Sequence, residues 1–568
     1  MKHYVYVVSS LLLVSIASLV YADDDDIMEQ NNSSIVVDPL NIDTCQKCAS
    51  PLFIPRPQSL NSAALYTPFY YPCCKGTIDQ ACTVSLGFRY EQTWNGKQLA
   101  QCLFGSDVIN FAGSQATKEP STYYLLAENF GLSPDFLGAI TFDPLIRNSI
   151  IDIGARCELG SYSSCLENLY VGLAASLVNS TWNLRAREDN FNTVRPDKLT
   201  LPQCLHGTTE EPALGDIKTA LSGQYSFGQL PRGPMRYGGF IFDRSQSKTL
   251  LANIDLVLGY DFMRCEGYHL GLFLKTVFPT GNRPNPEKVF SPIIGNAHHW
   301  ELGGGLDAHY DLWHCDDQCL TASITGSITH LFDDKQWRTF DFNGCCLSRY
   351  QLLKVFTKKS NDHLPYANQL MFGTDYTTRQ VNSSFDLMGD ATLKFVYRNC
   401  GWAFGIGYNV YGRSAEDIEP LSDTCAAESV VVANKGTTGV CVINNDNATV
   451  TQISNATLSA SCIESSDVTI PPTVDNPVLQ TGYKTWDNIT PAPDSSKPVI
   501  YNTSNITYKG APRQISQKIF GHIDYQWEDC ENNPYIGFGG ECEFAQNGDC
   551  NVCTANQWGM WVHGGLSF

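Results

Sequence analysis

A histidine between two carboxylates is the first candidate for chemistry: Asp307, His309 and Asp311 follow one another at intervals of two residues. On an extended strand this spacing places all three side chains on one face. A carboxylate beside an imidazole can activate water for hydrolysis, so the trio is a candidate acid–base site. The same spacing also suits a plain hydrated face, and we favour that interpretation.

Other histidines offer weaker chemistry. His330 lies near Ser327 and Thr329, but these hydroxyls fall on the opposite face of an alternating strand. His298 and His299 are adjacent, and adjacent side chains on a strand diverge. The sequence also shows no phosphate-binding glycine loop and no nucleophile elbow. We therefore predict that the protein is not an enzyme and has no catalytic residues, no metal and no cofactor.

Two cysteine pairs resemble half-sites of a zinc ribbon: Cys45 with Cys48, and Cys550 with Cys553. The chain has 22 cysteines and an apparent export signal, so it matures in an oxidising compartment. Disulfides are favoured there over zinc, and we predict disulfides whose connectivity the sequence leaves open.

Cysteines also fall in or beside the short connections described below. Disulfides within or between neighbouring turns are favoured, because intramolecular closure has the higher effective concentration. Disulfide cross-links to other envelope proteins remain the alternative. The cysteines concerned are Cys165, Cys265, Cys315, Cys319, Cys400 and Cys530.

The elements that would position these side chains are alternating strands. Apolar and polar residues alternate with period two in twelve segments, as on the two faces of a sheet. The segments are 84–91, 151–159, 169–177, 252–262, 268–275, 300–311, 320–332, 387–398, 402–412, 515–527, 535–545 and 557–568.

The connections between these segments alternate between short and long along the whole chain. An up-and-down barrel sorts its loops in this way, with short turns at one end and long loops at the other. Strands of about ten residues are long enough to cross a bilayer when tilted. Tryptophans near strand ends are typical of membrane-interface girdles; here they are Trp94, Trp182, Trp300, Trp313, Trp402, Trp527 and Trp558. We predict an all-β protein: a closed up-and-down antiparallel transmembrane β-barrel of about 12 strands, with long extracellular loops.

The predicted domain organisation has four parts. Residues 1–22 form a signal peptide, with a basic start, an apolar core and a cleavage site at Val20-Tyr21-Ala22. Residues 23–82 form a periplasmic N-terminal arm that plugs the lumen or lies against its inner rim. Residues 83–568 form the barrel, with a large extracellular insertion at 413–514. No later apolar run is long enough for a transmembrane helix.

The last strand, QWGMWVHGGLSF, has Met560, Val562, Leu566 and Phe568 at alternate positions. With the export signal, this ending resembles that of Gram-negative outer-membrane β-barrels. The resemblance implies an outer-membrane location and recognition of the C-terminal strand by the barrel-assembly machinery. The stretches PIIGNAHHWELGGGL and PYIGFGGECEFAQ look like those of cysteine-rich, porin-like proteins of intracellular bacteria, with the chlamydial porin as the nearest analogy.

If the apolar residues face lipid, the alternate residues line the lumen. Acidic residues predominate among them, which predicts a preference for cations. The lumen candidates are Arg89, Glu91, Asp152, Arg156, Glu158, Asp255, Asp261, His269, Lys275, Glu301, Asp307, His309, Asp311, Asp390, Lys394, Asp524, Glu541 and Glu543.

The net charge of -20 argues against nucleic-acid binding, which needs a basic face. The predicted partners are outer-membrane lipid, the assembly machinery and small hydrophilic solutes. We predict a porin-like channel for passive diffusion of such solutes. The alternative is a structural or adhesive surface protein whose barrel only anchors disulfide-bonded loops, and the two differ in whether the lumen is open.

Overall fold

The computed structural model describes only part of the chain. The described residues are 50, 52–59, 82–113, 116–117, 119, 122, 124–133, 135–161, 166–191, 213–225, 234–265, 267–315, 318–343, 347–357, 366–421, 430–434, 500–528, 530, 532–545 and 553–567. The predicted signal peptide lies outside them, as does most of the predicted arm and most of the insertion. The boundaries of those parts stay predictions.

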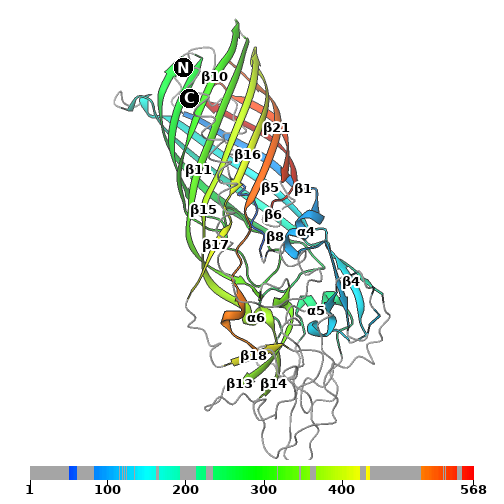
Figure 1. The fold of residues 1–568 in the computed structure, drawn as a ribbon. Helices are drawn as coiled ribbons and strands as arrows, with labels where there is room; N and C mark the ends of the chain where they lie inside the picture. The colour runs from blue at the N-terminus through cyan, green and yellow to red at the C-terminus, as the bar shows by residue number, and fades with distance from the viewer. Residues whose placement is uncertain are drawn as a thin grey trace, which may run out of the picture.

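Twelve long antiparallel strands form a closed barrel, as the sequence predicts (Figure 1). Each strand pairs with the next ring strand in chain order, including β11 with β15, and pairing of β23 with β1 closes the sheet. In chain order the strands are β1 (Cys82–Thr93), β5 (Leu145–Glu158), β6 (Leu169–Asn183), β8 (Gln246–Cys265), β9 (Tyr268–Phe278), β10 (Glu301–Cys315), β11 (Gln318–Thr339), β15 (Thr378–Asn399), β16 (Trp402–Arg413), β21 (Gln514–Gln526), β22 (Tyr535–Ala545) and β23 (Gln557–Ser567).

The outer surface of the barrel is apolar. Large hydrophobic side chains point outward from every strand at alternate positions, which is the arrangement that a lipid environment requires. They include Val84, Leu86, Phe88, Ile151, Ile153, Leu173, Leu177, Leu256, Leu258, Leu272, Leu274, Leu302, Phe332, Leu393, Phe395, Phe404, Ile406, Ile519, Ile523, Ile536 and Phe538. The described residues contain no helix that is long and apolar enough to span a membrane.

The last strand closes the barrel. β23 pairs with β1 from Thr83↔Ser567 to Thr93↔Gln557 and with β22 on its other side. The closure leaves no open edge, whose unpaired amides would be costly in lipid. Of the predicted assembly signal, the side chains of Met560, Val562 and Leu566 face outward, and Phe568 lies outside the described residues. Their recognition by assembly machinery stays a prediction.

Short turns lie at one end of the barrel and long connections at the other, as predicted. The short turns join β5 to β6, β8 to β9, β10 to β11, β15 to β16 and β21 to β22. The turn between β15 and β16 needs a glycine, because Gly401 has a φ of 80° and a Cβ there would lie 2.6 Å from the Gln526 carbonyl oxygen. The two ends are called the short-turn end and the long-loop end below.

The long-loop end is more structured than the sequence patterns predict (Figure 1). It carries small sheets, short helices and an aromatic-rich core. Its helices are α4 (Gly96–Phe104), α5 (Ile217–Ser222) and α6 (Gly373–Thr377). Its strands are β2 (Val108–Ala112), β3 (Leu125–Leu126), β4 (Leu137–Thr141), β7 (Arg187–Asn190), β12 (Asp341–Phe342), β13 (Leu352–Thr357), β14 (Tyr366–Phe372), β17 (Glu416–Pro420), β18 (Val430–Asn434), β19 (Ile500–Tyr501) and β20 (Ile506–Thr507). These elements are too short to give a clear periodic signal.

Several barrel strands are longer than predicted, among them β11 and β15. β11 and β15 pair from Asp334↔Ser383 to Thr339↔Thr378, beyond the predicted ends at 332 and 387. The apolar alternation stops where the pair leaves the barrel wall, so the pattern ends before the strands do. One expected girdle residue is also different: Trp182 faces inward and is only 1% exposed, whereas Trp94, Trp300 and Trp402 are exposed.

Two disulfides are present among the described residues. Cys82 and Cys157 join β1 to β5 at the short-turn end. Cys102 of α4 bonds to Cys553, just before β23, at the long-loop end. Cys553 is thus paired with a distant cysteine rather than forming a zinc half-site, while Cys45, Cys48 and Cys550 lie outside the described residues.

The outward face predicts how the barrel responds to a charge. Leu272→Arg on β9 places a cation at mid-strand on the apolar surface and is expected to cost about 2–4 kcal/mol of unfolding free energy in lipid. Chemical denaturation in lipid vesicles measures this cost. Phe191→Arg, an equally apolar-to-charged change at an exposed site outside the barrel, is the control and should cost far less. Equal, small effects of both changes would contradict a lipid-facing surface.

Candidate functional site

The barrel interior gathers the predicted lumen residues. Strand register and contacts place all of them on the inner face, and their role in a pore stays a prediction. Most are buried: Arg89, Glu91, Arg156, Asp255, Asp261, His269, Lys275, Glu301, Asp307, Asp390, Lys394, Asp524, Glu541 and Glu543. Partly exposed to the interior are Asp152, Glu158, His309 and Asp311.

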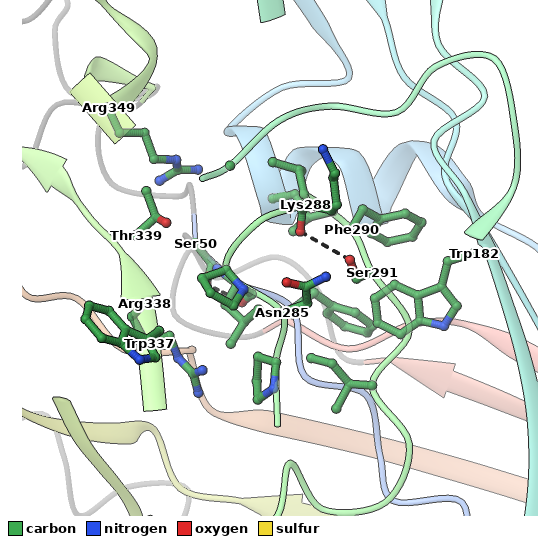
Figure 2. A pocket seen from close by; sticks show the side chains of 18 of the residues that line it. Ser50, Trp182, Asn285, Lys288, Phe290, Ser291, Trp337, Arg338, Thr339 and Arg349 are labelled. Carbon is green, nitrogen blue, oxygen red and sulfur yellow. Dashed lines mark hydrogen bonds between the residues drawn. The ribbon is translucent and has the colours of Figure 1, made fainter. Parts of the chain in front are cut away.

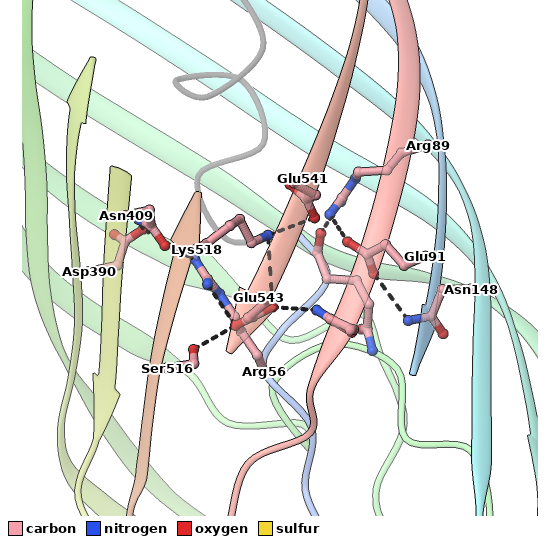
Figure 3. A network of polar contacts seen from close by, with 12 residues as sticks. Arg56, Arg89, Glu91, Asn148, Asp390, Asn409, Ser516, Lys518, Glu541 and Glu543 are labelled. Carbon is pink, nitrogen blue, oxygen red and sulfur yellow. Dashed lines mark hydrogen bonds and ion pairs between the residues drawn. The ribbon is translucent and has the colours of Figure 1, made fainter. Parts of the chain in front are cut away.

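A segment from the predicted N-terminal arm lies inside the barrel (Figure 3). The Arg56 guanidinium donates to the Glu543 carboxylate at 3.0 Å and to the Asn409 side-chain oxygen at 2.7 Å. It also lies 3.8 Å from the Asp390 carboxylate. The Arg56 side chain is only 7% exposed. Arg56 therefore joins β15, β16 and β22 across the interior.

A second cation, Lys518, contacts the same Glu543 carboxylate of β22 (Figure 3). Lys518 of β21 donates to Glu541 at 2.8 Å and lies 3.9 Å from Glu543. Ser516 and Gln557 also donate to Glu543, each at 2.5 Å. The Glu543 carboxylate is thus satisfied by two cations and two neutral donors, which is what a buried carboxylate requires.

Arg89 of β1 links the arm to a neighbouring part of the wall. Its guanidinium donates to Asp152 at 3.1 Å, to Glu91 and to the backbone carbonyl of Gln58. Glu91 also accepts from the Asn148 side chain at 3.2 Å. The arm is consequently held through Arg56 on β15, β16 and β22, and through Gln58 on β1.

The arm is also held where it leaves the barrel at the long-loop end. The backbone carbonyl of Ile54 accepts from the Gln514 amide at 2.6 Å and from Arg413 at 3.3 Å. Phe53 packs on the inward-facing Trp182, with ring centroids 6.0 Å apart. A small cavity of about 60 Å³ lies beside Ser50 and Trp182 (Figure 2). The arm and the surrounding loops therefore share the wall of this cavity.

Beside Arg56 the interior is nearly filled. The cavity between the arm and the wall, lined by Arg56, Arg89, Glu91, Lys518 and Glu543 among others, has a volume of about 30 Å³. The arm therefore packs closely against this part of the wall.

A third cluster lies on β5, β8, β9 and β10. Arg156 contacts Glu158 at 3.1 Å, Asp307 at 3.4 Å and Asp261 at 3.7 Å, and its guanidinium stacks on Tyr170. Arg264 adds a second cation beside Glu158. The Arg156 guanidinium thus contacts carboxylates from three strands, β5, β8 and β10.

The histidines of this cluster have structural partners. His269 is 2.7 Å from the Asp261 carboxylate, and its ring stacks on that of His309. Asp307 accepts from Thr325 at 3.3 Å, and Asp311 accepts from Thr321 at 2.8 Å. The structure therefore places Asp307, His309 and Asp311 on one inner face, as their spacing predicts. The absence of enzyme activity stays a prediction.

The remaining lumen candidates also have partners. Asp255 pairs with Lys275 at 3.1 Å, and Asp390 accepts from Asn409 at 3.2 Å. Glu301 accepts from Asn296 and Thr329. Asp524 is flanked by His522 and, at 2.8 Å, by His563. Lys394 is buried on the same inner face.

Sequence reasoning missed two central residues of the network. Lys518 shares the inward parity of Asp524 on the same strand, so the alternation could have identified it. Arg56 had no comparable signal, because it lies in a proline-rich segment without periodicity and 353 residues from Asn409. Arg56 and Lys518 offset part of the acidic excess on which the predicted cation preference rests, although carboxylates still outnumber cations.

A further buried ion pair holds the long-loop end together, outside the barrel ring. Glu416 of β17 accepts from Arg338 at 2.9 Å, from Ser383 at 2.5 Å and from the Ala511 amide at 2.7 Å. Burial alone would raise the pKa of the Glu416 carboxyl, but Arg338 and these hydrogen bonds outweigh it and hold the pKa below its usual value.

Comparisons with known proteins return only distant structural matches. The sequence matches no protein-family model and no curated protein. Among solved structures, the chain is similar to an outer-membrane channel from Pseudomonas putida, with 9% identity, 87% of this chain and 100% of that chain covered, and a TM-score of 0.33. A FadL homologue from Pseudomonas aeruginosa has 8% identity, coverage of 86% and 90%, and a TM-score of 0.25.

A third similar structure is the toluene transporter TodX from Pseudomonas putida, with 8% identity, coverage of 89% and 92%, and a TM-score of 0.27. At TM-scores this low the three structures carry no argument about this chain, and the resemblance to the chlamydial porin stays a prediction.

The Glu416 site predicts a pH dependence. Because its pKa is depressed in the folded state, the pair stabilises the fold above about pH 4.3, the usual carboxyl value, and this stability is lost as pH falls through the folded pKa. Glu416→Gln should lower the unfolding free energy by roughly 3–5 kcal/mol at neutral pH, because Arg338 stays buried without its carboxylate. It should also reduce the fall of the unfolding free energy at acidic pH.

Denaturation of the reconstituted protein between neutral and acidic pH measures both effects. Glu419→Gln, an exposed glutamate on the same strand, is the matched control and should leave the profile unchanged. If Glu416→Gln loses as much stability at acidic pH as the wild type does, Glu416 is not the group responsible.

Proposed function

We propose that the protein is an outer-membrane channel for passive diffusion of small hydrophilic solutes, and that residues 52–59 close its lumen in the state described. The observation that carries the proposal is the line of ionisable side chains along the inner wall, combined with a separate segment that crosses them. An exported chain of a Gram-negative-type bacterium, assembled through its C-terminal strand, fits this role.

The chemistry of the inner wall supports transport of polar solutes. A barrel that served only as an anchor could fill its interior with apolar or small side chains, and charge is costly to bury without partners. Here charged side chains occur from the level of Arg56 to the short-turn rim, where Arg156, Arg264 and Glu158 gather. Such a wall can be hydrated when the segment is displaced.

The charge balance gives the proposed selectivity. Displacing the arm removes Arg56 from the wall and leaves Glu543 and Asp390 with one cation fewer. The open lumen would then be more acidic than the closed one. A fixed negative lining favours cations, so the proposed channel prefers cations when open.

The second candidate is an anchor for a surface domain. The filled interior beside Arg56 and the structured core of the long-loop end favour it. The two candidates differ in one property, because an anchor keeps its lumen closed whatever happens to the arm.

Single-channel conductance in planar bilayers under a salt gradient tests the proposal. Arg56→Met removes the contacts to Glu543, Asp390 and Asn409 while keeping an unbranched side chain. Loss of one partner of a buried ion pair costs roughly 3–5 kcal/mol, so the arm should leave the lumen more often. We expect more frequent and larger open steps than in the wild type, with a cation-selective reversal potential.

Arg187→Met is the control, because Arg187 is exposed and pairs with Asp189 outside the barrel. Heat-modifiable mobility on electrophoresis would show that each variant is folded. A folded Arg56→Met barrel that stays silent would overturn the channel and favour the anchor. Open steps without selectivity would retain the channel and overturn the cation preference.

A further inference from the structure

A β-bulge near the short-turn end of β10 changes the face of the sheet on which the His314 side chain lies. Asp311 pairs with Thr321, but the next pair is Trp313 with Leu320, so Leu312 is an extra residue. Leu312 and Trp313 consequently both point outward, at 51% and 45% exposure. Bulges commonly redirect side chains next to functional sites.

The bulge puts His314 on the same face as Asp311. Without it, simple alternation would place the two side chains on opposite faces, because they are three residues apart. Beyond the bulge His314 pairs directly with Cys319 of β11, and Cys319 is buried at 1% exposure. Three side chains of different types thus converge on one hairpin.

The three potential ligand atoms are close enough for one ion. A carboxylate oxygen of Asp311, a ring nitrogen of His314 and the Cys319 sulfur all lie within 4.8 Å of one another. Ligand bonds of about 2.0–2.3 Å put the ligands of tetrahedral zinc some 3–4 Å apart, so only small side-chain adjustments are needed.

A neighbouring hydroxyl supports two of these ligands. Thr321 donates to Asp311 at 2.8 Å, and its oxygen lies 3.3 Å from the Cys319 sulfur. Such outer contacts orient metal ligands and are a regular part of metal sites. The set of one thiolate, one imidazole and one carboxylate suits a divalent transition metal and suits calcium or magnesium poorly.

We propose that Asp311, His314 and Cys319 bind a divalent transition-metal ion of the zinc type at the short-turn rim. A water molecule completes the fourth position. The ion joins β10 to β11 next to their turn, at the proposed periplasmic mouth of the lumen. This site departs from the sequence-based expectation of no metal, and it does not depend on whether the barrel conducts.

Cobalt(II) is the probe, because a cobalt–thiolate bond gives a charge-transfer absorption that carboxylate or imidazole ligands alone do not. The full-length barrel, refolded in detergent with a non-chelating reductant, should show this band and lose it when zinc is added. Cys319→Ser should abolish the band. His314→Ala should weaken cobalt binding by at least about tenfold, the scale of losses seen even for supporting contacts.

Matched controls separate this site from adventitious binding. Cys542→Ser removes an exposed thiol on the outer face of β22, and His330→Ala removes an exposed histidine on β11. Neither change should alter the band. Heat-modifiable mobility verifies that each variant is folded.

Three results would overturn the proposal. They are the absence of a band in the folded wild type, a band that survives in Cys319→Ser, and a Cys319 that mass spectrometry finds in a disulfide in protein exported to the envelope. A band that needs Cys319 and His314, with Cys319 reduced in the exported protein, would establish the site.

Discussion

The structure depends on the need to give every buried charge a partner inside the barrel. Lipid outside forces apolar side chains outward, so the polar half of each strand must point inward. A charge there is tolerated only with a counter-charge or hydrogen-bond donors. Glu543 illustrates the rule, since its oxygens are shared among Arg56, Lys518, Ser516 and Gln557.

This requirement makes the arm part of the barrel. Arg56 supplies the interior with a cation that contacts Glu543, Asp390 and Asn409 on three strands. Removing the segment leaves those groups short of a partner, and keeping it fills the passage beside the wall. In the proposed channel, the same contacts would stabilise the closed state and set the free energy that opening must overcome.

The sequence predicted the parts of this arrangement that follow from periodicity. Alternation with period two located the twelve strands, the outward set from Val84 to Leu566, and the inward set from Arg89 to Glu543. It failed where periodicity carries no information. The short helices and sheets of the long-loop end have no periodic pattern. The paired ends of β11 and β15 beyond the barrel wall lack apolar alternation, so the pattern does not show that these strands continue. The bulge at Leu312 reverses the alternation that would have placed His314 outward. Arg56 could not be placed from the sequence, because its partners lie on three strands that are distant in sequence and meet it only in the folded barrel.

The most direct test of the account is the coupling energy between Arg56 and Glu543. Unfolding free energies of the wild type, Arg56→Met, Glu543→Gln and the double variant, measured by denaturation in lipid vesicles, form a double-mutant cycle. If the wall holds the arm, the coupling should be about 1–3 kcal/mol, as for residues in one buried network. The exposed pair Arg187 and Asp189 provides the reference, which should stay below about 0.5 kcal/mol. A coupling for Arg56 and Glu543 as small as this reference would show that their ion pair does not hold the arm to the wall.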